Sequence, residues 1–313
     1  MALRRSHVGF EDQTLRDGLQ SEPRRLSLVE KRQLIDGLVQ AGLKRIQVGS
    51  FVHPRRVPQM ADTDELVRAL KPPEGVVFSG LVLNARGLDR ALACGLSDVA
   101  LSASVSDSHS RRNANQGATA AIDAVAGLIR EAVQAGLAVR GGLQCVFGCV
   151  DEGAVDPDRV LAAAEKLAAA GARALNLADT TGMAHPRQVA ALCARIGKAL
   201  PDIELILHLH DTRGLGLANM LAGFEAGVRS FDVCTGGLGG CPFVRGAAGN
   251  VPTEDAVHAF EAMGVDTGID LDGLVRVVDA LERLFERRLP GRMAAVLRAA
   301  REKAGACGTK TDG

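Results

Sequence analysis

A short apolar run, a polar turn and an Ala- and Leu-rich amphipathic stretch follow one another repeatedly along this chain, and the repeat restricts the folds open to it. The apolar runs predict β-strands at residues 7–13, 45–48, 76–83, 98–102, 138–146, 174–178, 204–208 and 230–233. The amphipathic stretches predict α-helices at 28–41, 62–70, 86–94, 117–135, 158–170, 186–199 and 216–226. Five helices run into a glycine of the kind that closes a helix in the left-handed conformation: Gly42, Gly95, Gly136, Gly171 and Gly227.

Strands that alternate with helices pair in parallel, because a helix-length crossover must return the chain to the same end of the sheet. The rival architecture, an open doubly wound sheet, carries a Gly-rich phosphate loop after an early strand. The first strand here is followed by Thr-Leu-Arg-Asp-Gly-Leu-Gln, which is not such a loop. We therefore predict an α/β fold, a (β/α)8 TIM barrel over about residues 7–265 with additional C-terminal helices over about 271–304, in one domain spanning 1–313.

Composition argues against several classes of function. Acidic and basic residues balance at 37 each, so no net charge draws the chain to nucleic acid or to anionic lipid. No run approaches the roughly 20 apolar residues of a membrane span, and the first residues lack the apolar stretch of a signal peptide. Seven cysteines, scattered and odd in number, are typical of reduced thiols. We expect a cytoplasmic protein that binds neither nucleic acid nor membranes.

Two polar groups lie where such barrels keep their chemistry, at the carboxyl ends of strands and in the loops that follow. Arg16 and Asp17 follow the first strand, and such a pair alone is most often an ion pair or a helix cap. His208 and His210 lie at the end of the seventh strand, and side chains two residues apart on a strand point the same way. Both imidazoles can therefore reach one cation, with Asp211 placed to orient a ring. A single buried histidine is usually a satisfied core residue, but this spacing favours a metal site.

The segment after the eighth strand, residues 235–250, is rich in glycine. Its six glycines cannot pack a core and are typical of a loop that moves or lets a ligand approach closely. The alternative is a flexible surface loop. Cys241 in this segment is a candidate catalytic thiol at the mouth of the barrel, although most single cysteines are inert.

Asp17, His208, His210 and Asn250 together offer two nitrogen and two oxygen ligands. This set suits Mg²⁺ or Mn²⁺ with positions left open for substrate oxygens, and no Cys-x-x-Cys pair indicates structural zinc. Asn113 and Asn115 are expected in a loop after the fourth strand. Gln47, at the end of the second strand, is a candidate catalytic residue beside Arg16, Asp17 and Cys241. Other side chains near strand ends are candidates for substrate binding or for the lining of the site: Gln20, Ser50, Asn84, Asn113, Asn115, Cys145 and Thr180.

Six segments carry a resemblance to a known family. They read RDGLQ at 16–20, SFV at 50–52, VPQM at 57–60, HLHDT at 208–212, GLGGCP at 237–242 and GNVPTED at 249–255. In this order they resemble the 3-hydroxy-3-methylglutaryl-CoA lyase family, one of the DRE-type TIM-barrel metallolyases, collinearly from about residue 7 to residue 270. The wider group includes isopropylmalate and homocitrate synthases, which carry extra C-terminal regions for which this chain has little room.

The resemblance implies an activity and a role for each group. A divalent metal on the four ligands would chelate the tertiary hydroxyl of an acyl-CoA thioester and a carboxylate or carbonyl oxygen. Loss of the hydroxyl proton then drives retro-Claisen cleavage to a keto acid and the enolate of acetyl-CoA. Arg16 would stabilise the thioester oxygen, and Cys241 would protonate the enolate carbon. The family also implies substrate contacts for Gln20, Ser50, Asn84 and Thr180, with Asn113 and Asn115 near the CoA part, and a homodimer.

Two positions depart from the lyase pattern. Gln47 stands where the family has a glutamate beside the catalytic arginine and the metal, and an amide cannot serve as a base. The first strand reads Asp-Gln-Thr-Leu at 12–15 where the lyase branch has Val-Gly-Pro. These departures keep three alternatives open. They are a lyase for another 3-hydroxy-acyl-CoA, such as a citramalyl-type thioester, a Claisen-condensing synthase, and a non-catalytic binding barrel.

Overall fold

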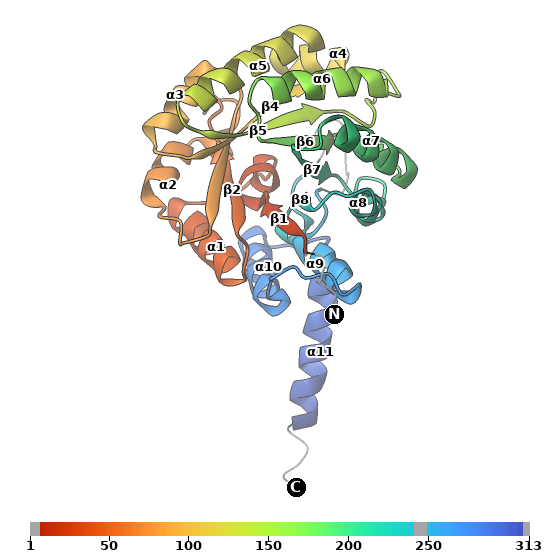
Figure 1. The fold of residues 1–313 in the computed structure, drawn as a ribbon. Helices are drawn as coiled ribbons and strands as arrows, with labels where there is room; N and C mark the ends of the chain where they lie inside the picture. The colour runs from red at the N-terminus through yellow and green to blue at the C-terminus, as the bar shows by residue number, and fades with distance from the viewer. Residues whose placement is uncertain (1–6, 241–248, 309–313) are drawn as a thin grey trace.

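The structure is a computed structural model, which describes residues 7–240 and 249–308, with side chains described up to residue 303. Eight parallel strands form a closed barrel in which each pairs with the next in sequence and β8 pairs with β1 (Figure 1). The strands are β1 (Gly9–Asp12), β2 (Arg45–Ser50), β3 (Val77–Val82), β4 (Asp98–Ser104), β5 (Ala138–Gln144), β6 (Ala174–Asp179), β7 (Glu204–Leu209) and β8 (Ser230–Val233). The predicted TIM barrel is confirmed.

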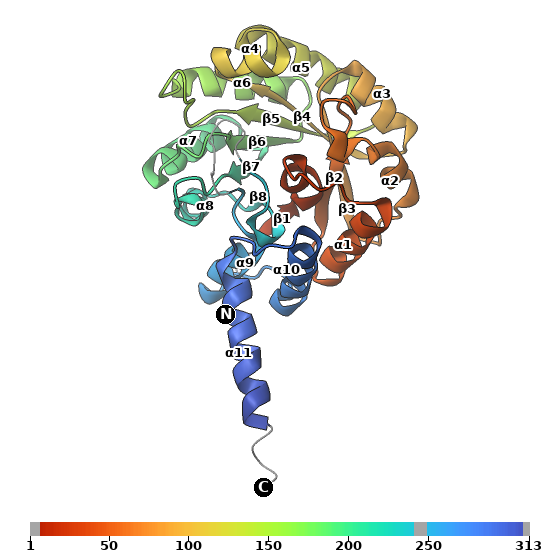
Figure 2. The ribbon, with the colours of Figure 1, turned by 180° about the vertical axis from the view of Figure 1, so that it is seen from behind.

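Helices follow the strands, and most of them lie against the outside of the barrel (Figures 1 and 2). They are α1 (Leu28–Gln40), α2 (Thr63–Ala69), α3 (Ala85–Ala93), α4 (Asp107–Ala114), α5 (Ala118–Gln134), α6 (Pro157–Ala169), α7 (Pro186–Ala199), α8 (Gly216–Glu225), α9 (Thr253–Ala262), α10 (Leu271–Phe285) and α11 (Arg292–Gly308). The five predicted glycine caps all have left-handed backbone, with φ between 77° and 103°. At Gly42 a side chain would in addition press on the carbonyl oxygen of Gly268.

Helix α4 corrects the prediction that Asn113 and Asn115 lie in a loop. Asn113 belongs to α4, and Asn115 ends it in the left-handed conformation with φ of 55°. The hydroxyl of Ser106 begins this helix by accepting a hydrogen bond from the His109 backbone N–H at 3.2 Å. The sequence DSHSRRNA has no apolar periodicity, so its helicity depends on these caps and was not predicted from the pattern.

Strand β2 contains an irregularity beside the site. Its register against β3 shifts between Gln47, which pairs with Ser79, and Gly49, which pairs with Gly80. Such a β-bulge leaves one residue unpaired and changes the direction of the side chains around it.

Successive side chains of β1 and β8 point alternately outward, into the apolar core under the helices, and inward, to the inside of the barrel. Phe10 and Phe231 pack with Phe260 of α9, at ring-centroid distances of 5.8 Å and 5.5 Å. The residues that follow them, Glu11 and Asp232, both contact Arg140 of β5 across the inside of the barrel. The inside of the barrel therefore carries charged side chains under the site, and the apolar core lies between barrel and helices.

The C-terminal helices extend the molecule on one side. Both views show α11 projecting away from the barrel beyond α9 and α10 (Figures 1 and 2). Arg298 ties α11 to Asp279 of α10 at 2.6 Å. In the described part of the chain, no helix is long and apolar enough to cross a membrane.

Candidate metal centre and substrate cavity

A π-helical turn over Thr14–Gly18 presents Arg16 and Asp17 directly after β1. Such turns are rare and are found mostly at functional sites. Gly18 closes this turn against the core, because a Cβ there would lie 2.7 Å from the sulfur of Cys234. The Arg16 guanidinium donates to the Asp17 carboxylate, so the two side chains form the ion pair considered from the sequence.

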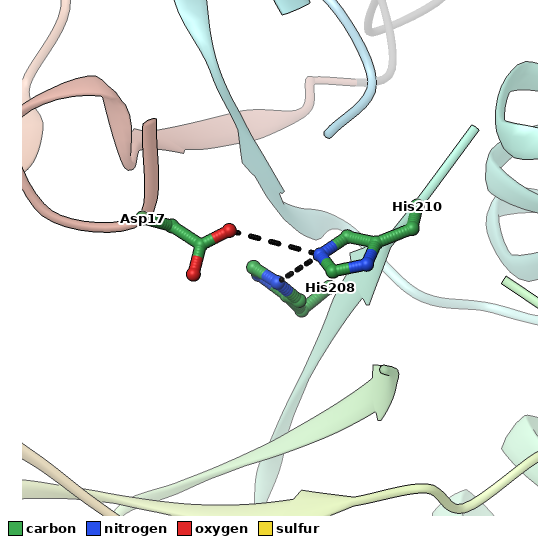
Figure 3. A group of neighbouring side chains, drawn as sticks. All are labelled: Asp17, His208 and His210. Carbon is green, nitrogen blue, oxygen red and sulfur yellow. Dashed lines mark hydrogen bonds and ion pairs between the residues drawn. The ribbon is translucent and has the colours of Figure 1, made fainter. Parts of the chain in front are cut away.

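The two histidines converge on Asp17, as Figure 3 shows. His208 lies on β7 and His210 just beyond it, and their Nε2 atoms are 3.2 Å apart. The Nε2 atom of His210 is 3.7 Å from an Asp17 carboxylate oxygen. One ligand atom from each of the three residues lies within 4.8 Å of the others. The predicted pairing of the histidines is therefore present, with a carboxylate from the other side.

Asn250 completes the four predicted ligands. Its amide Nδ2 donates to an Asp17 oxygen at 2.7 Å and to the Leu238 carbonyl at 3.2 Å. Its Oδ1 is buried and has no hydrogen-bond partner among the described residues. Because the nitrogen faces Asp17, the amide, whose two ends have nearly the same shape, would turn over to bring Oδ1 to a cation beside Asp17. Such a cation would offset the cost of about 1–3 kcal/mol of a buried oxygen without a donor. The donor set of two imidazoles, one carboxylate and one amide fits Mg²⁺ or Mn²⁺.

Electrostatics keep two of these ligands, Asp17 and His208, in the form that a metal needs. Burial acts to raise the pKa of Asp17, but Arg16 and the two histidines outweigh it and hold this pKa well below its usual range. Burial lowers the pKa of His208, which keeps its imidazole neutral. An ionised carboxylate and a neutral imidazole are the forms that coordinate a cation.

Asp232 orients His208 and was not predicted. The two residues are paired in register across β7 and β8, and the His208 Nδ1 lies 3.1 Å from an Asp232 oxygen. Burial acts to raise the pKa of Asp232, but Arg140 and His208 lower it to about 2. The ionised carboxylate therefore accepts a hydrogen bond from the His208 Nδ1–H, which leaves the Nε2 lone pair on the side of His210. Asp211, which the sequence predicts for this role, instead accepts a hydrogen bond from the backbone N–H of Gly216, the first residue of α8, at 2.7 Å.

Arg16 is held by two amides in addition to Asp17. Its Nε donates to Gln47 Oε1 at 2.5 Å, and its Nη2 donates to Gln13 Oε1 at 3.0 Å. Both glutamines are fully buried. Gln47 therefore lies beside the arginine, where the resemblance places the family's glutamate, and Gln13 is a second contact, which the sequence pattern did not predict.

A cavity of about 1000 Å³ opens over these residues. Among the predicted residues, its lining includes the side chains of Arg16, Asp17, Gln20, Gln47, Asn84, Asn113, Asn115, Thr180, His208 and His210. Ser50 is buried at the end of β2 and is not among the described lining residues. Cys241 lies outside the described residues.

Some of the lining side chains also have structural contacts. Asn84 uses its Oδ1 to accept from the Gly87 backbone and so caps α3. The Thr180 hydroxyl accepts from the backbone of Cys145, which follows β5 with φ of 60°. Asn113 contacts the His109 ring at 3.0 Å. Gln20 and Asn115 also line the cavity.

Comparison with known proteins identifies the family. A family model described as HMGL-like matches residues 7–281. The chain belongs to the HMGL-like family. It is 42% identical over 293 residues to the (R)-citramalyl-CoA lyase of Chloroflexus aurantiacus, covering 90% of this chain and 92% of that protein. It is 40% identical over 262 residues to the hydroxymethylglutaryl-CoA lyase of Pseudomonas mevalonii, covering 84% and 87%.

A solved structure agrees with the sequence comparison. The HMG-CoA lyase of Bacillus subtilis superposes with a TM-score of 0.90 at 34% identity, covering 94% of this chain and 98% of that chain. The resemblance to the lyase family is therefore confirmed, as is the prediction of an acyl-CoA carbon–carbon lyase as the class of enzyme. The two relatives are named for different acyl-CoA thioesters. Membership of the HMGL-like family therefore does not identify the substrate, which has to be inferred from the residues of the site.

Proposed function

We propose that this HMGL-like protein cleaves 3-hydroxy-3-methylglutaryl-CoA to acetyl-CoA and acetoacetate with Mg²⁺ or Mn²⁺. The observation that carries this proposal is the convergence of Asp17, His208 and His210 beside Arg16 in one cavity. The relatives named for this reaction support it. The bound metal would hold the tertiary hydroxyl and a neighbouring oxygen of the substrate and lower the pKa of that hydroxyl.

The residues of the chain would then orient the substrate and stabilise charge. Asp17, His208, His210 and Asn250 would hold the metal. Arg16 faces the cavity and donates to the thioester oxygen as negative charge develops there when the carbon–carbon bond breaks. Cys241 would supply the proton that the enolate carbon takes up, so that acetyl-CoA leaves, and the proton released from the substrate hydroxyl would restore the thiol. Gln20, Ser50, Asn84, Asn113, Asn115 and Thr180 are proposed as substrate-binding residues.

A second candidate substrate is citramalyl-CoA, which would give acetyl-CoA and pyruvate. Two observations favour it. Gln47 replaces the family's glutamate next to Arg16, and the relative at 42% identity is named for this thioester. A condensing reaction that joins acetyl-CoA to a keto acid would use the same site in the reverse direction.

The test is an assay with both thioesters. Purified protein is incubated with each substrate and Mg²⁺ or Mn²⁺, with and without EDTA, and acetyl-CoA, acetoacetate and pyruvate are followed by mass spectrometry. Acetoacetate release that EDTA abolishes supports the first substrate, and pyruvate release supports the second. Failure to cleave either thioester despite bound Mn²⁺ would contradict both and favour a binding barrel.

Variants of the histidines test the metal site directly. His208→Ala is expected to abolish metal-dependent turnover, because the ligand pair on β7 is broken. His258→Ala is a matched control, because His258 is exposed on α9 and lies outside the cavity lining. Full activity of His208→Ala would refute the metal site. A homodimer and a cytoplasmic location are further parts of the proposal, and sedimentation and cell fractionation would test them.

A further inference from the structure

The two departures from the lyase pattern meet on one side chain. Gln13 lies beyond β1 and Gln47 on β2, yet both amide oxygens accept hydrogen bonds from the Arg16 guanidinium. Arginine has only donors, so the amide oxygens must face it and the amide nitrogens must face away. The contact with Arg16 therefore fixes which end of each glutamine amide is oxygen and which is nitrogen.

The amide nitrogens that face away have nothing to bind. Gln47 Nε2 and Gln13 Nε2 are both buried without a hydrogen-bond partner among the described residues. Gln47 lines the cavity, whereas Gln13 lies behind the guanidinium, outside the described lining. Because an unmade buried hydrogen bond is costly, a donor of Gln47 at the wall of the cavity indicates a ligand that brings an oxygen to it.

The charges around Gln47 indicate whether the ligand oxygen is neutral or anionic. A glutamate in place of Gln47 would bring a second negative charge to Arg16, beside Asp17. With a neutral amide, Asp17 is the carboxylate in direct contact with the Arg16 guanidinium among the described residues, and Asp17 also faces the histidines. The surroundings of Gln47 therefore favour an anionic oxygen. In the proposed cleavage, the electrons of the carbon–carbon bond move onto the thioester and place negative charge on its oxygen.

We propose that Gln47 Nε2 and Arg16 together bind the enolate oxygen of the acetyl-CoA half, so that Gln47 is a catalytic oxyanion donor and Gln13 positions Arg16. This inference rests on the proposed function and adds a role for the amide that the family's glutamate cannot have. The bond electrons reach the oxygen, the carbon takes up a proton, and Gln47 neither gives nor accepts one. Gln47 acts as a hydrogen-bond donor throughout, and position 47 contributes no titrating group to the pH profile.

Binding of an enolate mimic tests the inference without turnover. S-carboxymethyl-CoA carries an anionic oxygen one carbon beyond the position of the enolate oxygen, and free CoA is the reference that lacks this carboxylate. With Mg²⁺ present, the wild type should bind the mimic at least about 10-fold more tightly than CoA. Gln47→Leu should lose this excess and keep its affinity for CoA, whereas Gln13→Leu should keep most of the excess because the donor of Gln47 remains.

Measurement of kcat and KM distinguishes an oxyanion donor at Gln47 from a side chain that only fills space. Gln47→Leu should lower kcat by about 10²–10³-fold with KM within about 3-fold. Gln47→Glu keeps the size and the contact to Arg16 but should also lose the preference for the mimic, so it decides the matter if Gln47→Leu does not fold. An undiminished preference for the mimic in both variants would overturn the inference. Failure of the wild type to bind CoA at all would instead overturn the proposed function.

Discussion

Asp232→Asn should weaken metal binding although Asp232 does not touch the metal. In the native protein one Asp232 oxygen accepts from Arg140 at 2.8 Å, and the other accepts from Asn176 at 2.9 Å and faces the His208 Nδ1 at 3.1 Å. An amide has one oxygen and one nitrogen, so it cannot accept on both sides. If the oxygen stays with Arg140, the nitrogen faces His208 and takes the Nδ1 lone pair as its acceptor.

That contact changes the tautomer of His208. An imidazole that accepts at Nδ1 carries its proton at Nε2, and the Nε2 lone pair for the cation is lost. The opposite orientation of the amide places its nitrogen against the charged guanidinium of Arg140, which has only donors, whereas the first orientation places it against the amide of Asn176, which can turn over to accept. Loss of the partner that orients a metal-binding histidine typically lowers affinity 10–100-fold. The expected cost in metal-binding free energy is therefore about 1.4–2.7 kcal/mol.

Titration of Mn²⁺ into metal-free protein, followed by calorimetry, measures this cost. The matched control is Glu11→Gln, because Glu11 is the other carboxylate on Arg140, at 3.0 Å, and does not contact His208. Both variants remove one negative charge from the same guanidinium, so both should lower the melting temperature, but only Asp232→Asn should weaken Mn²⁺ binding. Wild-type affinity in Asp232→Asn, or an equal loss in Glu11→Gln, would refute the reasoning.

Two further predictions concern other groups. Cys241→Ser should lower turnover by about 10²–10⁴-fold, because a hydroxyl is a poorer acid than a thiol, while Mn²⁺ affinity stays unchanged; steady-state kinetics with the cleaved thioester would contradict this if kcat were retained. Burial raises the pKa of Glu254 from 4.5 to about 8, so the folded protein keeps a proton that the unfolded chain releases. The stability from this proton is full below pH 4.5 and is lost as the pH rises through 8. In Glu254→Gln the free energy of unfolding should therefore fall less steeply with rising pH, by up to about 1.4 kcal/mol per pH unit. Urea unfolding of both proteins between pH 5 and 8 measures this difference. Equal slopes of unfolding free energy against pH would contradict the prediction.

The sequence predicted the parts of the site that local patterns encode. The histidine pair followed from the alternation of side chains along a strand, and Asp17 followed from its place after the first strand. The barrel itself followed from the repeated strand, helix and glycine cap. Each of these depends on residues that are close together in the chain.

The parts that the sequence did not reveal depend on contacts between distant segments. Asp232 reads as one acid in a short strand until the register with β7 places it beside His208. The contact of Gln13 with Arg16 depends on a π-helical turn that no pattern indicated. Asp12 likewise accepts from Thr235 and Thr253, more than 200 residues away in the chain, and ties the end of β1 to the segment after β8.

The bulge in β2 changes the spacing of the residues that point to the inside of the barrel. Gly49 points outward, since a side chain there would meet Thr63 of α2 at 2.7 Å, so Ser50 turns inward along with Gln47. The inward positions of this strand are thus three residues apart. A mutant library that varies every second residue from Gln47 would introduce side chains at position 49 that clash with Thr63 of α2, and it would leave Ser50 unchanged. Engineering of substrate choice through this strand has to step from 47 to 50.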